Sequence, residues 1–447
     1  MKNRGAYPLR VERTDMSLLI TGATVADGRV RDVRVEGETI TAIEESLDPR
    51  EDERVVNATG KMLFPGAIDA HVHFREPGFS HKETWETGSQ SAAAGGVTVV
   101  ADQPNTQPPT TTGSAFDEKA GLAAASLIDF GISGGVTADW DPDSLFDRPL
   151  FALGEVFLAD STGDMGIDAD LFADAVERAA DADVTVTVHA EDADLFDESA
   201  QKRDTGGTGE GADADVWSQY RAAEAEEAAV ERAVSVGSDS EADIHIAHTS
   251  TPEGVDAAKA GGATCEVTPH HLFLSRADAT ELGTYGRMNP PLRSEDRREG
   301  MWERVVSGEI DIVATDHAPH TRAEKDADLW DAPSGVPGVE TMLPLLLEEA
   351  RKGTISYERV RDVTAANAAE IFDLPQKGRV EVGSDADLVV FDPEESQEIH
   401  GADLHSRCGW TPFEGMRGVF PEMTLVRGHV VYEDGKFGDA VGENVRN

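Results

Sequence analysis

Residues 69–78 read Asp69-Ala70-His71-Val72-His73-Phe74-Arg75-Glu76-Pro77-Gly78 and follow an apolar run in which Pro65 and Gly66 predict a bend. A strand is expected to start after this bend. Alternate side chains of a strand lie on one face, so His71 and His73 are expected side by side, with Arg75 on the same face. Two imidazoles at this spacing can bind one metal ion, although a bare His-x-His pair is also compatible with two structural histidines near a turn.

The same pattern, a short apolar run followed by polar residues, recurs along the chain. Eight such runs lie at residues 67–72, 97–101, 128–132, 151–158, 184–188, 244–247, 263–267 and 310–314. Helix-like stretches rich in Ala and Glu separate several of them, including residues 168–180 and 222–236. Eight strand–helix units predict an α/β fold, a (β/α)8 barrel of the TIM type over residues 65–375, with its parallel strands buried on both faces. A doubly wound sheet has the same alternation, because a strand count does not show closure.

The polar residues at the ends of these runs favour the barrel, whose enzymes place their chemistry at the carboxyl ends of the strands. The set is His71, His73, Asn105, Glu155, His189, His248, His270, His271, Asp316 and His320. A single histidine at a strand end is often structural, but many polar strand ends around one rim are not explained by packing. Four histidines and two carboxylates of this set are suited to hold one or two Zn²⁺-like ions.

The two ends of the chain differ from the middle. Residues 18–25, 30–35 and 39–43 have β-type composition, and so do residues 386–392 and 423–432. Neither end alone has enough strands for a stable sheet. We therefore expect residues 1–64 and 376–447 to pair into one small β-sandwich domain.

The surface charge is extreme. The 447 residues include 39 basic and 86 acidic side chains, a net charge of −47. Such a charge destabilises a compact fold at low salt, whereas at about 1 M salt the screening length falls to about 3 Å. The acids are dispersed along the chain instead of forming one tail, which indicates a halophilic surface; a basic partner protein is the alternative. Nucleic acid and anionic membranes are excluded as expected partners.

Two cysteines, Cys265 and Cys408, are too few for a disulfide framework or a thiolate metal site and suit a reducing compartment. No apolar run approaches about 18 residues, and the N-terminus lacks the apolar centre of a signal peptide. We therefore expect a soluble, cytoplasmic protein without membrane association. The sequence does not determine the oligomeric state, and a homo-oligomer is possible.

Several motifs together resemble the signature set of dihydroorotases, which belong to the amidohydrolase superfamily. They lie at residues 71–78, 104–106, 288–293, 314–320, 337–344 and 409–415, so the resemblance spans nearly the whole chain. It implies a metal-bearing barrel with a side β-sandwich. It also implies the reversible interconversion of N-carbamoyl-L-aspartate and (S)-dihydroorotate plus water, a step of de novo pyrimidine (UMP) biosynthesis.

The resemblance implies one metal held by His71, His73 and Asp316 and a second held by His189 and His248. Where many relatives carry a carbamate-modified lysine, this chain has Glu155. A glutamate already has the two oxygens that the carbamate supplies, on a shorter arm, so we expect Glu155 to bridge the ions. The alternatives are that Glu155 stands behind a single-metal site, or that Asp160 is the bridge.

The chemistry implied by the resemblance begins with Zn²⁺, one or two ions, which activates water. Asp316 would take up the proton and return it to the departing ring nitrogen. The substrates are small anionic ureides, and Arg75 is suited to bind their carboxylate bidentately. The family's other substrate contacts fall on Asn105, Asn289, His320 and Gly335. We expect His270 and His271 to be wall residues and residues 159–164 to form a loop that closes over substrate.

Two other functions fit parts of this pattern. Allantoinases and hydantoinases share the metal ligands but generally lack the arginine after His-x-His and the Pro-Asn-Thr motif, so Arg75 and Asn105 discriminate against them. A non-catalytic homologue that scaffolds an assembly is the other alternative. Such homologues usually lose metal ligands, whereas this chain retains His71, His73, His189, His248 and Asp316.

Overall fold

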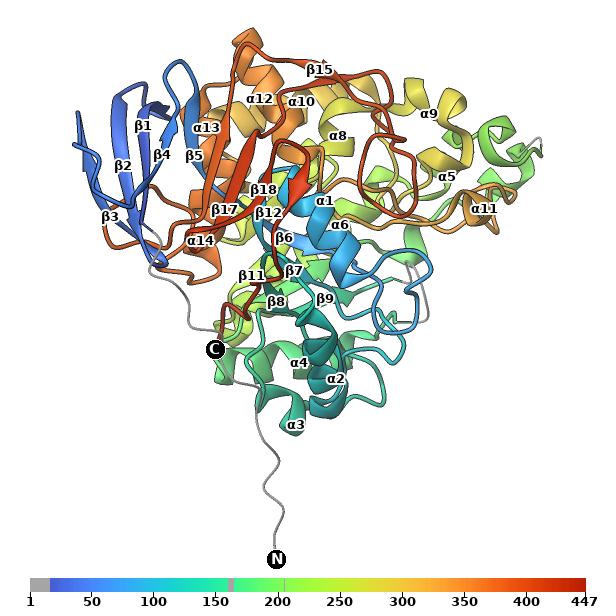
Figure 1. Ribbon diagram of the computed structural model, residues 1–447. Coiled ribbons are helices and arrows are strands. Elements are labelled where there is room, and N and C mark those ends of the chain that lie inside the picture. The colour runs from blue at the N-terminus through green and yellow to red at the C-terminus, as the bar shows by residue number, and fades with distance from the viewer. Residues whose placement is uncertain (1–16, 160–164, 205) are drawn as a thin grey trace, which may run out of the picture.

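The computed structural model describes residues 17–159, 165–204 and 206–447, and its centre is a parallel barrel (Figure 1). The barrel strands are β6 (Ala67–Val72), β7 (Val97–Asp102), β8 (Asp129–Ile132), β9 (Leu153–Phe157), β10 (Val186–His189), β11 (Ile244–Ile246), β12 (Thr264–Val267) and β13 (Ile312–Val313). They form two parallel sheets, β6-β7-β8 and β9 to β13. Backbone bridges from Gly134 to Leu153 and from Val72 to His317 join the sheets at both seams. The barrel is therefore closed, which confirms the expected fold; the doubly wound alternative is wrong.

Helices surround the strands. The longer ones are α1 (Trp85–Ala94), α2 (Gly113–Ala123), α4 (Ala169–Asp181), α6 (Ala223–Ser240), α7 (Pro252–Ala260), α10 (Glu295–Ser307) and α12 (Met342–Lys352). The shorter ones are α3 (Pro142–Phe146), α5 (Asp215–Tyr220), α8 (Pro269–Phe273), α9 (Arg276–Leu282), α11 (Arg322–Lys325), α13 (Tyr357–Arg361) and α14 (Asn367–Ile371). The stretches predicted to be helical correspond to α4 and α6. The N-cap of α4 is Asp168, whose side chain accepts a hydrogen bond from the Leu171 N–H.

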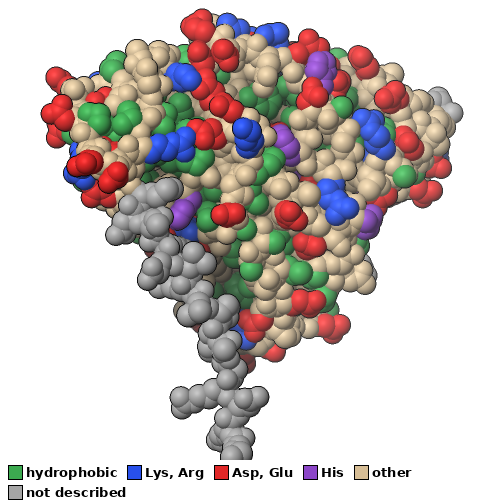
Figure 2. Space-filling model, viewed as in Figure 1, with side chains coloured by type: hydrophobic (Ala, Val, Ile, Leu, Met, Phe, Trp, Pro, Cys, Tyr) green, Lys and Arg blue, Asp and Glu red, His purple; other side chains and the backbone are tan. Residues whose placement is uncertain are grey.

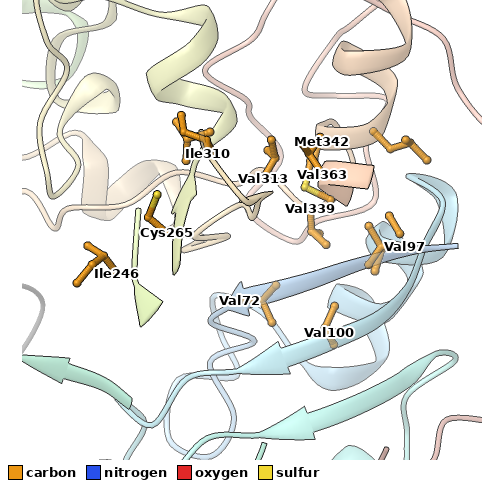
Figure 3. Close-up of a cluster of buried hydrophobic side chains, with 14 of the residues drawn as sticks. Val72, Val97, Val100, Ile246, Cys265, Ile310, Val313, Val339, Met342 and Val363 are labelled. Atoms are coloured by element: carbon orange, nitrogen blue, oxygen red, sulfur yellow. The ribbon is translucent and has the colours of Figure 1, made fainter. Parts of the chain in front are cut away.

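Apolar side chains fill both faces of the barrel wall. Val72, Val100, Cys265 and Val313 from four strands belong to one buried cluster with Met342 of α12 (Figure 3). A second buried cluster combines Ile68 and Val99 from the strands with Phe151, Ala368 and Phe372. All six residues of β6 and all six of β7 are buried, as expected for strands covered on both sides.

Both chain ends contribute to one nine-stranded sheet beside the barrel (Figure 1). Its strands are β1 (Ser17–Val25), β2 (Val30–Glu36), β3 (Thr39–Glu44), β4 (Arg54–Asn57), β5 (Met62–Pro65), β14 (Leu388–Phe391), β17 (Met423–Val426), β18 (His429–Glu433) and β19 (Lys436–Phe437). The ends meet where β5 pairs with β14, with Phe64 opposite Val389. The apolar run before the barrel is thus itself a strand. Residues 423–432 form an antiparallel hairpin, with a turn at Arg427 and Gly428, and a separate ribbon pairs β15 (Gln397–Glu398) with β16 (Arg417–Gly418).

A buried group of charges joins the barrel to this sheet. The Lys377 ammonium lies 2.6 Å from Asp129 of β8 and 2.7 Å from Asp387, which precedes β14. Arg427, in the β17–β18 turn, also pairs with Asp129. Removing one partner of such a buried group leaves another charge unpaired, so the set strongly favours one arrangement of the two parts.

In the face shown in Figure 2, Asp and Glu side chains are scattered over the surface and outnumber Lys and Arg. Among the helices of the described ranges, none combines the length and the apolar character needed to cross a bilayer.

Candidate metal centre

The residues expected to bind metal come from five strands and meet at the carboxyl end of the barrel. His71 is in β6 and Glu155 is in β9, His189 ends β10, and the remaining three, His73, His248 and Asp316, lie directly after or near the ends of β6, β11 and β13. All six side chains are buried. Two groups have possible ligand atoms within 4.8 Å of one another, one of His71, His73 and Glu155 and one of Glu155, His189 and His248.

Glu155 belongs to both groups. Its Oε1 lies 2.8 Å from Nδ1 of His189 and 2.6 Å from Nε2 of His248. Its Oε2 lies 3.4 Å from Nε2 of His71. The two oxygens therefore face histidines of different groups, as a carboxylate shared by two ions would. The shorter arm of glutamate does not prevent this position.

Asp316 lies beside the first group. Its Oδ1 is 2.9 Å from Nε2 of His73 and 3.6 Å from Nε2 of His71. Burial acts to raise the pKa of Asp316, but the hydrogen bond from His73 and the charges of His71 and His73 act more strongly, so the pKa lies below its ordinary value. The carboxylate is therefore ionised at neutral pH and can accept a proton.

The residues fit a bound cation. Nε2 of His71, the ring atom that faces Glu155 and Asp316, is buried without a hydrogen-bond partner in the described part of the chain. A buried imidazole nitrogen without a partner is unfavourable unless a ligand such as a metal ion occupies its lone pair. Burial would lower the pKa of His189, but hydrogen bonds with Glu155 and Glu191 raise it to about 9. The buried carboxylates therefore favour positive charge here, whether a proton or a metal ion.

Two carboxylates behind the histidines had no role in the sequence prediction. Glu191 lies 3.0 Å from Nε2 of His189 and accepts a 2.6 Å bond from Nη2 of Arg221. Glu266, on β12, lies 2.6 Å from Nδ1 of His71 and accepts from the His248 backbone N–H at 3.1 Å. Such partners orient a ligating ring and fix its tautomer. The sequence offered two signals: Glu191 lies two residues after His189, and Glu266 is the one charged residue of the run 263–267.

A buried network fixes the positions of the first two ligand-bearing strands. Asp102 accepts a 2.6 Å bond from the Phe74 N–H and pairs with the fully buried Lys119 at 2.6 Å. The side chain of Gln103 donates to the Ala70 carbonyl at 3.2 Å and accepts from the Glu155 N–H at 2.7 Å. These bonds tie the strand that carries His71 to the strand that carries Glu155.

The expected substrate contacts adjoin the expected metal ligands. Asn105 Oδ1 lies 2.6 Å from Nδ1 of His73. The buried Arg75 donates from Nε to the Pro319 carbonyl at 3.2 Å, and its Nη2 lies 3.1 Å from Nε2 of His320. Burial lowers the pKa of Arg75 to about 10, which leaves the guanidinium charged at neutral pH.

Two more expected contacts continue this wall. Asn289 Oδ1 accepts a hydrogen bond from Ser334 Oγ at 3.2 Å, and Gly335 directly follows Ser334 in the chain. Gly335 has φ +126°, and a Cβ there would lie 2.7 Å from the Ala318 Cβ and 3.3 Å from Nε2 of His320. Glycine therefore allows this loop to lie close to the histidine.

The adjacent histidines of α8 differ from each other. His271 is held by Thr268 at 2.9 Å and by the Pro290 carbonyl at 3.1 Å, as a wall residue would be. Nε2 of His270 is buried and has no hydrogen-bond partner among the described residues. Of the predicted closing loop 159–164, residues 160–164 lie outside the described residues, and so does the alternative bridge Asp160.

Comparison with known proteins gives a consistent result. The family model described as "Amidohydrolase family" matches residues 62–431. A curated dihydroorotase from Halobacterium salinarum is 66% identical over 96% of this chain and 99% of the relative, and one from Methanosarcina acetivorans is 42% identical over 90% and 89%. Among solved structures, an L-hydantoinase (dihydropyrimidinase) from Arthrobacter aurescens has a TM-score of 0.89 at 28% identity, covering 96% of this chain and 99% of that one. The chain therefore belongs to the amidohydrolase family and, within it, to the dihydroorotases.

Proposed function

We propose that this protein is a metal-dependent dihydroorotase that interconverts N-carbamoyl-L-aspartate and (S)-dihydroorotate plus water in pyrimidine biosynthesis. The observation that carries the proposal is the buried, charged Arg75 beside a buried histidine–carboxylate centre. In a chain with a net charge of −47, a buried guanidinium at this point suits a small carboxylate-bearing substrate. The dihydroorotase names of relatives at 66% and 42% identity support the same reaction.

We assign the metal as zinc, with two ions per chain. His71, His73 and Asp316 would hold the first ion, and His189 and His248 would hold the second, with Glu155 shared. Imidazole and carboxylate donors suit Zn²⁺. The presence of Glu155 in both groups of ligand atoms supports two ions over one.

A bound divalent ion would polarise the ring amide carbonyl, whose carbon becomes the new carboxylate of N-carbamoyl-aspartate, and would lower the pKa of a water molecule. In hydrolysis the ring C–N bond breaks, hydroxyl adds to the carbonyl carbon and a proton goes to the departing nitrogen. Asp316 is suited to carry that proton, because its carboxylate is ionised and adjoins both His71 and His73. Ring closure is the reverse, with water leaving.

Substrate binding is assigned to the wall that starts at Arg75. The guanidinium would pair with the carboxylate, and His320 adjoins it. Asn105, Asn289 and Gly335 would supply the remaining polar contacts. We also propose that the enzyme works in the cytoplasm of a halophile, where molar salt screens the repulsion between the acidic surface and the anionic substrate.

The alternative is another cyclic-amide hydrolase, because similar solved structures include hydantoinases. Hydantoin has no carboxylate for Arg75 to bind, so the charged wall favours dihydroorotate. A scaffold without catalysis does not account for six assembled ligands.

Zinc-loaded protein in molar KCl, assayed in parallel with dihydroorotate, allantoin and hydantoin, tests the proposal. We expect dihydroorotate to be turned over with the highest kcat/KM. Turnover of hydantoin or allantoin without dihydroorotate would reassign the enzyme, and no turnover of any of the three would favour the scaffold.

A further inference from the structure

Lys82, in the connection between β6 and α1, contacts His320, one of the residues assigned to substrate binding. Its side chain is mostly buried, and Nζ lies 3.0 Å from Nδ1 of His320 and 3.0 Å from Oε1 of Glu324. Glu324 is itself fixed, because its Oε2 accepts from the Thr321 N–H at 2.9 Å and from the Thr321 hydroxyl at 2.8 Å. Lys82 is therefore held in a defined position against the histidine ring. An ion pair with Glu324 would be enough to stabilise the fold at this point, so the additional contact of Lys82 with His320 calls for another explanation.

The contact with Lys82 determines which nitrogen of His320 carries the proton. An ammonium group only donates hydrogen bonds, so Nδ1 of His320 must be the acceptor. The ring is neutral, because burial and the charges of Arg75 and Lys82 hold the pKa of His320 well below its ordinary value. A neutral ring that accepts at Nδ1 carries its hydrogen on Nε2. That hydrogen is donated to the Ser334 carbonyl at 2.9 Å.

This tautomer leaves two donors facing each other. Nη2 of Arg75 lies 3.1 Å from Nε2 of His320, and both nitrogens carry hydrogen. Nε2 of His320 therefore cannot accept a hydrogen bond from Arg75. The guanidinium instead donates from Nε to the Pro319 carbonyl. The Nε2 hydrogen is already donated to Ser334, so the ring does not bind the Nη2 hydrogens of Arg75. These hydrogens remain for a carboxylate, and charge-assisted bonds of this kind are strong.

We propose that Lys82 is a positioning residue for substrate recognition: it holds His320 as the Nε2–H tautomer, which donates to Ser334 and cannot accept from Arg75, so that Nη2 of Arg75 donates to the substrate carboxylate. This inference rests on the proposed function, since it requires a carboxylate-bearing substrate. It predicts that Lys82 acts on substrate affinity and contributes little to the chemical step.

The test compares Lys82→Met and Lys82→Arg in the full-length, zinc-loaded enzyme. Loss of a charge-assisted hydrogen bond predicts a KM for dihydroorotate about 10- to 100-fold higher in Lys82→Met, with kcat within about threefold. Arg also only donates, so Lys82→Arg is expected to retain most of the affinity. The matched control is Lys352→Met, which removes an exposed lysine of α12 that pairs with Glu349, and its KM should be unchanged.

A second measurement reads the tautomer directly. In protein labelled with ¹⁵N-histidine, with the His320 signals assigned by their loss in His320→Gln, the wild type should show hydrogen on Nε2 only. Lys82→Met should give a mixture of tautomers, and Lys82→Arg should resemble the wild type. Hydrogen on Nδ1 in the wild type would overturn the proposal even if Lys82→Met failed to fold. A normal KM in folded Lys82→Met, or a fall confined to kcat, would also overturn it. Failure of the wild type to turn over dihydroorotate would instead refute the proposed function, while the NMR result would still judge the role of Lys82.

Discussion

One carboxylate connects the two groups of histidines at the centre of this protein. Glu155 Oε1 faces His189 and His248, and Oε2 faces His71. The amide in Glu155→Gln keeps the shape but loses the charge that would bind two cations. We expect bound zinc to fall from about two ions per chain to one or fewer, and kcat to fall on the order of 10²-fold or more. Metal analysis with steady-state kinetics measures both, and unchanged stoichiometry and rate would remove Glu155 from the centre.

The carboxylate behind His189 should affect metal affinity. Glu191 bonds to the ring nitrogen opposite Glu155 and is held by Arg221. Loss of such a partner typically weakens metal binding by about 10- to 100-fold, which is the expected result for Glu191→Gln in a competition with a zinc chelator. Asp192→Asn is the control, because the neighbouring Asp192 pairs with Arg232 and bonds to no metal ligand. Equal zinc affinity in the two variants would contradict the role of Glu191.

The donors of this site could be predicted because they follow apolar runs, and the carboxyl ends of barrel strands meet at one rim. Their supporting partners could not be predicted in the same way. His71 and Glu266 are 195 residues apart in sequence, and their 2.6 Å contact depends on the register of β6 and β12 on either side of β13. The contact between Lys82 and His320 likewise joins residues that are 238 positions apart.

Among the elements, β9 and β10 are in unusually close contact at Gly154. This residue has φ +139°, and a Cβ would collide with the Thr187 hydroxyl and carbonyl on β10. We expect Gly154→Ala to lower the free energy of unfolding by about 1–3 kcal/mol and to weaken zinc binding, because Glu155 is the next residue. Gly121→Ala, in α2 with no atom near the added methyl group, should be neutral or slightly stabilising.

Denaturant unfolding in molar KCl measures both variants. Equal stability of Gly154→Ala and the wild type would show that the two strands can separate enough to accept a side chain.

The strand–helix alternation was predictable because each barrel strand is a short apolar run buried on both faces. Closure was not, since it depends on backbone bridges such as the one between Gly134 and Leu153. The sequence does not indicate β5 as a strand, because its four residues, Met62–Pro65, are too few to show a period. Residues 423–432 form one continuous β-type stretch in the sequence, in which only Gly428 marks the turn of the hairpin. The division of the chain at residues 64/65 and 375/376 stays a prediction.

For the whole molecule, the net charge of −47 determines the conditions under which it folds (Figure 2). Between about 0.1 M and about 1 M salt the screening length falls from about 10 Å to about 3 Å, so repulsion between the dispersed acids largely disappears. We expect Tm to rise steeply with KCl over this range and KM for dihydroorotate to fall. Sucrose at matched osmolality is the control and should not reproduce the gain. A Tm independent of KCl would contradict a halophilic surface.

Dihydroorotate hydrolysis should depend on zinc bound in the mouth of the barrel. Metal-stripped protein is titrated with Zn²⁺ in molar KCl, and the initial rate of dihydroorotate hydrolysis is measured at each step. We expect no activity without metal and a rise to a plateau at about two equivalents per chain. Full activity in the stripped protein, or no hydrolysis at any zinc loading, would contradict it.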